Sequence, residues 1–393
     1  MIYVVYNMWY KNRKSKVCPV MNKAIKYRVY PSDEQAVMFA KTFGCCRKVY
    51  NLMLNDKLES YKTTGKFVYV TPAMYKKEYL YLKEVDSLAL ANVQLNLQKA
   101  FRNCFDKSRK KRNGFPKFKS AKHSRKSYTT NNQKGTVAII GNTIKLPKIG
   151  KVKAVIHRQP EVDWTVKSAT VSQESDGAFY ISVLFEFERN IVQAAKSDNV
   201  IGLDYKSDGL YMDSNGNIGS NHKYYRESHE KLAKEQRRLS RKTGSKKNQP
   251  KSKNYLKQLK KVNKIHRHIT NQRIDNLHKL STEIANQVDA VCVESLDMKA
   301  MSNKGFGNGK ATLDNGYGIF LNMLEYKLSD RGKYFIKVDK WYPSSQLCSS
   351  CGSQKKITLA DRIYKCSCGL EIDRDYNAAI NIKNEGLRLL KAA

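Results

Sequence analysis

Acidic residues are scarce in this chain. Its 393 residues include 35 aspartates and glutamates against 73 lysines and arginines, so the net charge is +38 at pH 7. Repulsion among so many like charges destabilises a compact fold unless an acidic partner offsets it. The composition is therefore too one-sided to serve solubility alone, and it favours a protein that binds nucleic acid.

Long apolar runs are also missing. No stretch approaches the roughly 18 consecutive apolar residues of a membrane-spanning helix, and residues 1–8 lack the length and the cleavage site of a secretory signal. We therefore expect a soluble intracellular protein, cytoplasmic and associated with the nucleoid. Of the nine cysteines, four gather near the C-terminus, which in a reducing compartment indicates a metal site rather than a disulfide framework.

The N-terminal half predicts a small β unit that is interrupted by helices. The alternating pattern from Met21 looks like a fresh start, so we interpret residues 1–20 as an extension that is not native. Ser32, with Gln35 three positions later, predicts a helix start, and a second helical segment is predicted over residues 72–105. Alternating segments then predict strands at residues 136–140, 143–146, 152–156, 169–173 and 179–187.

Two strongly basic segments are candidates for nucleic-acid contact. Residues 107–126 carry ten lysines and arginines and no acid, interleaved with Phe115 and Phe118. Residues 231–267 carry fifteen against one acid, Glu235, on a predicted helical pair with a single apolar face. Either segment could be a solvated surface, but cations mixed with aromatic rings suit a groove that follows a phosphate backbone. The candidate contact residues are Lys107, Arg109, Lys110, Lys111, Arg112, Lys117, Lys119, Arg237, Arg238 and Arg241.

Three acidic residues that lie far apart in the sequence are the candidate catalytic residues. Asp204 and Glu294 each end an apolar run that predicts a strand, and Asp375 precedes a helix predicted over residues 377–390. Taken singly, each acid is more often a turn former or a helix cap. Their shared position, at the ends of predicted elements, favours convergence at one edge of a sheet.

Converging carboxylates repel each other unless divalent cations lie between them. Two Mg²⁺ ions about 3.5–4 Å apart would activate a water molecule and neutralise charge at a scissile phosphate. On so basic a chain, this pattern predicts metal-dependent cutting of a polyanion. Asp208 and Asp373 are neighbouring alternatives, and we favour Asp375 over Asp373 as the ligand.

The C-terminal cysteines predict a zinc site. Cys348 and Cys351 form a C-x-x-C pair, and Cys366 and Cys368 follow with one residue between them. Four thiolates in two pairs fit tetrahedral Zn²⁺, and a redox dithiol is the alternative. Because the cluster lies between the second and third acids, we expect one structural zinc ion that stiffens a loop beside them.

Several motifs, spread over nearly the whole chain, resemble those of one known family. The most specific are the W-Y-P-S-S-Q-L-C-S-S-C-G run of residues 341–352 and the D-R-D-Y-N-A-A-I-N-I run of residues 373–382. The I-G-L-D run at 201–204, the G-F-P-K-F-K-S run at 114–120 and the opening at 21–31 match as well. They are similar to the TnpB family, RNA-guided nucleases encoded by insertion sequences and related to type V CRISPR effectors.

The resemblance implies a multidomain α/β architecture. An OB-like β-barrel, the wedge domain, would comprise residues 21–31 and 127–195, and a helical recognition domain of residues 32–126 would interrupt it. A RuvC/RNase H-like α/β nuclease domain would comprise residues 196–340 and 370–393. A zinc-ribbon insert would occupy residues 341–369.

The resemblance also implies the activity of an RNA-guided, Mg²⁺-dependent DNA endonuclease of a transposable element, which cuts its target next to a short adjacent motif. Asp204, Glu294 and Asp375 match the contexts of the RuvC acids. The implied partners are a guide RNA and double- and single-stranded DNA, with no membrane, and both a monomer and a dimer stay open.

The chain departs from the family pattern at two places. Ser295 stands where the family more often has a second acid, and the pair Cys366 and Cys368 is shortened. Two other functions remain open: a nuclease-inactive RNA-guided repressor, which the intact acids disfavour, and a strand-joining transposase.

Overall fold

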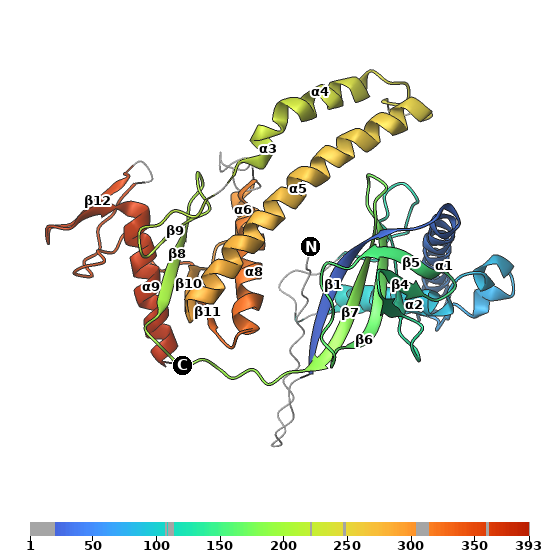
Figure 1. The fold of residues 1–393 in the computed structure, drawn as a ribbon, viewed down its shortest axis with the longest axis horizontal. Coiled ribbons are helices and arrows are strands. Elements are labelled where there is room, and N and C mark those ends of the chain that lie inside the picture. The colour runs from blue at the N-terminus through green and yellow to red at the C-terminus, as the bar shows by residue number, and fades with distance from the viewer. Residues whose placement is uncertain are drawn as a thin grey trace. The chain divides into compact units, whose positions relative to one another are not determined.

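The computed structural model of this chain describes residues 20–106, 108, 114–220, 222–246, 249–303, 314–358 and 361–392 (Figure 1). The extension expected at residues 1–20 lies outside these ranges except for Val20, as do five candidate contact residues, Lys107, Arg109, Lys110, Lys111 and Arg112. The chain divides into two compact units, Met1–Arg189 and Asn190–Ala393.

The N-terminal unit contains a seven-stranded antiparallel sheet with the strand order β2-β6-β7-β1-β5-β4-β3. Strand β1 (Val20–Tyr30) is first in the chain but lies in the middle of the sheet, and its side chains alternate between buried and partly exposed. Its pairing with β7 joins residues that lie between 150 positions (Val29 and Phe179) and 168 positions (Val20 and Glu188) apart in the chain. The other strands are β2 (Lys126–Asn131), β3 (Ala138–Ile140), β4 (Thr143–Leu146), β5 (Gly150–Val155), β6 (Thr165–Gln173) and β7 (Phe179–Glu188).

Two helices lie between β1 and β2 in the sequence. Helix α1 (Asp33–Thr64) begins with the predicted capping box, in which Ser32 and Gln35 bind each other's backbone N–H groups. The prediction of one helix over residues 72–105 is wrong in part. The chain makes two short 3₁₀ turns, η1 (Met74–Lys76) and η2 (Leu80–Lys83), before helix α2 (Ser87–Phe105).

Helix α2 starts late because Asp86 caps it. The Asp86 carboxylate accepts hydrogen bonds from the backbone N–H groups of Leu88 and Ala89, at 3.1 and 3.3 Å. This satisfies donors that a helix continuing from residue 72 would have bonded to carbonyls of the preceding turn. Strand β2 was not predicted either, because its sequence is polar and basic.

The C-terminal unit contains a four-stranded sheet with the order β11-β10-β8-β9. Strands β8 (Val200–Tyr205), β10 (Ala290–Glu294) and β11 (Tyr334–Val338) are parallel, and β9 (Tyr211–Asp213) pairs antiparallel to β8. The helices are α3 (Tyr224–Glu227), α4 (His229–Ser240), α5 (Lys253–Gln287), α6 (Met298–Met301), α8 (Tyr317–Ser329) and α9 (Arg374–Ala392). A separate two-stranded ribbon is formed by β12 (Ile363–Lys365) and β13 (Glu371–Asp373).

Helices cover both faces of this sheet (Figure 1). Leu203 and Val293 point to a core built with α5 and α8, whereas Cys292 points to a core built with α9. Because successive residues of a strand point to opposite faces, Asp204 and Glu294 project on the α9 side. Within the described ranges, no helix is long and apolar enough to cross a membrane.

Candidate functional site

The parallel pairing of β8 and β10 places two of the candidate acids side by side. Cys292 lies opposite Gly202 and Val293 lies opposite Leu203, so the next residues along the two strands are Asp204 and Glu294. Glu294 is the last residue of β10 and Asp204 the last but one of β8, and the carboxyl ends of parallel strands meet at one edge of a sheet. Asp204 and Glu294 therefore share this edge.

Helix α9 brings Asp375 to the same edge. The helix crosses β8 so closely at Gly202 that a Cβ atom there would overlap the carbonyl oxygen of Ala379 and lie 2.6 Å from the backbone nitrogen of Lys383. Asp375 lies one helical turn before Ala379, and Asp204 lies two residues after Gly202 along the strand. The close crossing thus directs the start of α9 toward the acidic strand ends.

The electrostatics of the three acids reflect this proximity. Burial, together with the negative charges of Asp375 and Glu294, raises the pKa of Asp204 to about 8, and burial is the largest of these causes. Burial also raises the pKa of Glu294. For Asp375 burial acts in the same direction, but hydrogen bonds from Lys206 and Arg374 outweigh it, and the pKa of this carboxyl is lowered.

The donor chemistry at this edge fits a hard divalent cation. Three carboxylates supply only oxygen ligands, which suit Mg²⁺, and the raised pKa of Asp204 shows that added positive charge would stabilise its ionised form. In the part of the chain that the structure describes, the carboxylates do not form a group as compact as the cysteine cluster described below. Ligands of two ions about 3.5–4 Å apart are spread over a larger space than the ligands of a single ion, so a less compact group of carboxylates is expected here.

The alternative acids have other surroundings. The Asp373 carboxylate accepts hydrogen bonds from the backbone N–H groups of Asp375 and Tyr376, at 2.9 and 3.0 Å, so it caps helix α9. This cap starts α9 at Arg374, three residues before the predicted start. The side chain of Asp208 is 74% exposed to solvent. Asp373 is therefore engaged as a helix cap and Asp208 faces solvent, which leaves Asp375 as the candidate metal ligand among the three.

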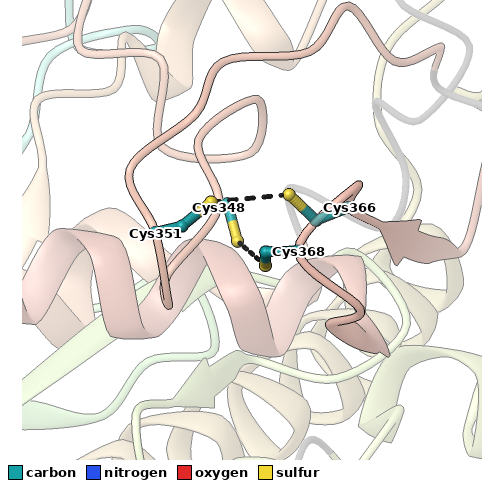
Figure 2. Close-up of side chains that lie close together, drawn as sticks. All are labelled: Cys348, Cys351, Cys366 and Cys368. Atoms are coloured by element: carbon teal, nitrogen blue, oxygen red, sulfur yellow. Dashed lines mark hydrogen bonds between the residues drawn. The ribbon is translucent and has the colours of Figure 1, made fainter.

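The four predicted zinc ligands come together. The sulfur atoms of Cys348, Cys351, Cys366 and Cys368 all lie within 4.8 Å of one another, and Figure 2 shows the side chains facing a common centre. A backbone N–H of Cys368 and the Ser353 hydroxyl lower the pKa of Cys366 to about 5, which favours the thiolate that binds metal. The shortened second pair does not prevent convergence, and the cluster fits one Zn²⁺ ion.

Two asparagines of helix α9 form hydrogen bonds with the segment that carries the four cysteines (residues 344–368, the cysteine loop). The same helix carries Asp375 to the sheet edge where Asp204 and Glu294 lie (the acidic edge). The Asn377 side chain donates a hydrogen bond to the Leu347 carbonyl at 2.6 Å and accepts one from the Ser349 N–H at 3.0 Å. The Asn381 side chain donates to the carbonyls of Ser344 and Leu347, each at 2.8 Å. Both asparagines are buried, so these bonds are shielded from water. The loop and Asp375 are therefore held by the same helix.

Sequence reasoning missed Asn377, Asn381 and Lys206. The two asparagines lie four residues apart, as residues on one helix face do, and this spacing was a usable signal. The role of Lys206 had no such signal, because its partner Asp375 is 169 residues away.

The described candidate contact residues divide between the two units. In the N-terminal unit, Lys119 is fixed by two hydrogen bonds of 2.8 Å between its backbone and the Asn51 side chain. It lines a pocket of about 270 Å³ together with three more cations, Arg47, Arg125 and Lys126. Lys117 is exposed nearby in sequence.

The other three candidates lie on or just beyond helix α4. Arg237 and Arg241 are exposed and lie four residues apart, so they share one face. Arg238 forms an ion pair of 2.7 Å with Glu235. The pair neutralises part of its charge, so Arg238 is a weaker candidate for phosphate contact than its neighbours.

Three protein-family models match parts of the chain. A model described as "Helix-turn-helix domain" matches residues 21–66, one described as "Probable transposase" matches residues 181–305, and one described as "Cas12f1-like, TNB domain" matches residues 317–382. The last match covers the cysteine cluster and the start of α9.

Two relatives extend over nearly the whole chain. A protein of Streptomyces pristinaespiralis named "Putative RNA-guided DNA endonuclease" is 34% identical over 378 residues, which cover 93% of this chain and 90% of that protein. The Escherichia coli K12 protein named "Putative RNA-guided DNA endonuclease InsQ" is 29% identical over 391 residues, covering 94% and 93% of the two chains.

A solved structure has a similar fold. The protein chain in the cryo-EM structure of the Cas12f1-sgRNA-target DNA complex superposes with a TM-score of 0.58 at 14% sequence identity, covering 93% of this chain and 99% of that chain. At this identity the likeness concerns the fold alone.

Proposed function

This chain belongs to the TnpB family of RNA-guided DNA endonucleases, and we propose that it cuts target DNA by Mg²⁺-dependent hydrolysis at the acidic edge of its C-terminal unit. The observation that carries the proposal is the parallel register of β8 and β10, which sets Asp204 beside Glu294. The negative charge of Asp375 also acts on Asp204. The DNA target would lie next to a short adjacent motif. The protein would be encoded by a transposable element and would act in the nucleoid.

The three acids share one task in this proposal, and two cations position one of them. Asp204, Glu294 and Asp375 would hold two Mg²⁺ ions by their carboxylate oxygens. When bound, Mg²⁺ supplies an activated water and neutralises charge on the phosphate. Lys206 and Arg374 fix the orientation of the Asp375 carboxylate, to which they bind at 2.7 and 3.0 Å.

The domain boundaries are part of the proposal. Residues 21–31 and 127–195 would form the OB-like wedge, with the helical recognition domain of residues 32–126 inserted. Residues 196–340 and 370–393 would form the RuvC-like nuclease domain. The observed order, one strand, two helices and six further strands, is the order that such an insertion requires.

The zinc-ribbon insert of residues 341–369 would hold one structural zinc ion. Asn377 forms hydrogen bonds between this insert and α9, so the zinc ion would help to keep α9 and Asp375 in position.

The basic surfaces would hold the nucleic acids. A guide–target heteroduplex of about 20 base pairs is recognised by its shape and backbone rather than by its bases, which requires cations along a surface. Lys119 with its neighbours in the pocket, and Arg237 with Arg241 on the α4 segment, provide such cations. The guide RNA and DNA would together offset much of the net charge of +38.

A cleavage assay with matched binding measurements tests the proposal. With guide RNA, target DNA and Mg²⁺, Asp204→Ala and Glu294→Ala should abolish cleavage while target affinity stays within about threefold of wild type, because the cationic surfaces are unchanged. Asp198→Ala, which removes an exposed acid that precedes β8 and is paired with Lys391, is the control and should cut normally. Equal loss of binding and cleavage would contradict the assigned roles.

The same assay separates the alternatives. A wild-type protein that binds its target but never cuts it would be a guide-directed repressor. Strand joining that survives treatment with ribonuclease would indicate a transposase.

A further inference from the structure

Both carboxylate oxygens of Asp375 are bound by cationic side chains. The Lys206 ammonium lies 2.7 Å from Oδ2, and the Arg374 guanidinium lies 3.0 Å from Oδ1. The three side chains are only 13–14% exposed to solvent, so water screens these contacts weakly. A metal ion that binds Asp375 must therefore share or displace one of the two cations.

Lys206 is the cation that a metal ion would displace. It lies two residues after Asp204 and directly beyond the end of β8, and its ammonium reaches Asp375 there. Arg374 instead precedes Asp375 in the chain and also lies within 3.5 Å of the Thr358 carbonyl, which holds it on the side of the cysteine loop. Lysine carries a compact, strongly hydrated charge on a flexible stem, and it leaves a site more readily than a forked guanidinium.

The backbone of Lys206 is held in place, and its ammonium has a second carboxylate, that of Asp208, at 4.0 Å. The Asn315 side chain donates hydrogen bonds to the carbonyls of Lys206 and Ser207, at 3.3 and 3.1 Å. Rotation of the lysine side chain toward the exposed Asp208 would therefore release the ammonium from Asp375 while Asn315 keeps the turn after β8 in place.

We propose that Lys206 is a positioning residue that holds Asp375 in the metal-free protein and competes with divalent metal for this carboxylate. This inference rests on the proposed function, in which Asp204, Glu294 and Asp375 are the metal ligands. An ammonium and a divalent cation on one carboxylate oxygen repel each other, so metal binding includes the cost of breaking the 2.7 Å contact. Lys206 would thus set the concentration of divalent metal that is needed to occupy the site formed by Asp204, Glu294 and Asp375.

Binding of Mn²⁺ to the full-length, zinc-loaded protein without nucleic acid tests this inference. Free Mn²⁺ is measured by electron paramagnetic resonance, so the readout does not depend on cleavage. Lys206→Met should lower the Mn²⁺ concentration for half-saturation about tenfold, the amount expected when a charge-assisted hydrogen bond no longer has to be broken. Lys206→Arg keeps a cation in place and should bind no more tightly than wild type.

Two controls make the result specific. Lys279→Met removes a lysine from an exposed ion pair with Asp275 in the same unit, and it should leave Mn²⁺ affinity unchanged. Thermal unfolding of each variant shows whether it is folded. If Lys206→Met does not fold, Lys206→Gln, which keeps a polar side chain without the charge, should show the same tighter binding.

The outcomes separate the inference from the proposed function. If Asp204→Ala loses Mn²⁺ binding and the uncharged Lys206 variants bind no tighter than wild type, the competition is overturned while the metal site stands. If Asp204→Ala binds Mn²⁺ as wild type does, the site itself is wrong, and the role of Lys206 falls with it.

Discussion

Gly202 of β8 lies directly beneath the carbonyl oxygen of Ala379 in α9, with no room for a Cβ atom between strand and helix. A second close contact lies along the same helix, where a Cβ on Gly386 would overlap the sulfur of Cys292 in β10. These two glycines let α9 pack its backbone against both central strands. The start of the helix, with Asp375, is placed by this packing.

We predict that Gly202→Ala displaces α9 and impairs the acidic edge. The added methyl group meets backbone atoms, which cannot rotate away, so the free energy of unfolding should fall by about 1–3 kcal/mol or more. Cleavage should fall with it. Gly44→Ala is the control, because nothing lies within 4 Å of its added Cβ in helix α1. Urea unfolding compares the two, and equal stability of both variants would contradict the close crossing.

We predict that Cys348→Ser releases zinc and lowers the melting temperature. Cys348 is the buried ligand of the four-sulfur cluster, and three remaining thiolates bind Zn²⁺ more weakly than four. Zinc content by metal analysis and thermal unfolding provide the two measurements. Cys104→Ser removes a cysteine outside the cluster and should keep the zinc. A Cys348→Ser protein with full zinc content would count against the metal site.

We predict that Asn377→Ala separates zinc binding from cleavage. The substitution leaves the Leu347 carbonyl and the Ser349 N–H without their Asn377 partner, which should cost about 1–3 kcal/mol of stability. The four thiolates remain, so zinc should stay bound while cleavage falls about 10- to 100-fold through misplacement of Asp375. Asn384→Ala, on the exposed side of the same helix, should cut normally. Loss of zinc in parallel with cleavage would show that the asparagine serves only the cysteine loop.

We predict that Arg237 and Arg241 make separate phosphate contacts. In the double variant to glutamine, target affinity should fall, and the slope of log K against log salt should become shallower by about 2, since each lost contact changes it by about 0.9. Arg388→Gln removes an exposed arginine that is paired with Glu385, and it should leave the slope unchanged. Binding measured at several salt concentrations decides, and an unchanged slope in the double variant would exclude both contacts.

We predict a loss of stability at acidic pH that depends on His278. Burial, with the nearby charge of Lys327, lowers the pKa of His278 from 6.5 to about 4. Between these values the unfolded chain binds a proton that the folded protein does not, so stability should fall as the pH drops from about 6.5 toward 4. After allowance for partial exposure, the expected loss at pH 5 is about 1 kcal/mol.

The variant His278→Gln isolates this contribution. Urea unfolding at pH 7 and pH 5 should show a smaller loss of stability in the variant than in the wild type. An equal loss in both proteins would mean that His278 is accessible to protons in the folded state.

Local chemistry made several elements predictable. The capping box of Ser32 and Gln35, the alternation of β1 and the paired cysteines all depend on residues close together in the chain, and the structure contains each of them. The errors were also local. Asp86 and Asp373 set the starts of α2 and α9 by accepting backbone hydrogen bonds, which apolar periodicity does not reveal.

The sequence by itself determined which residue types end the strands of this protein and which thiolates gather for zinc, because strand patterns and short ligand spacings are read over a few residues. Only the tertiary structure decided that the Lys206 ammonium binds the Asp375 carboxylate, 169 residues away, and that the Asn377 side chain forms hydrogen bonds between α9 and the cysteine loop. Such pairs arise when packing brings distant segments together. Their energy depends on burial and register, and neither is encoded near either residue.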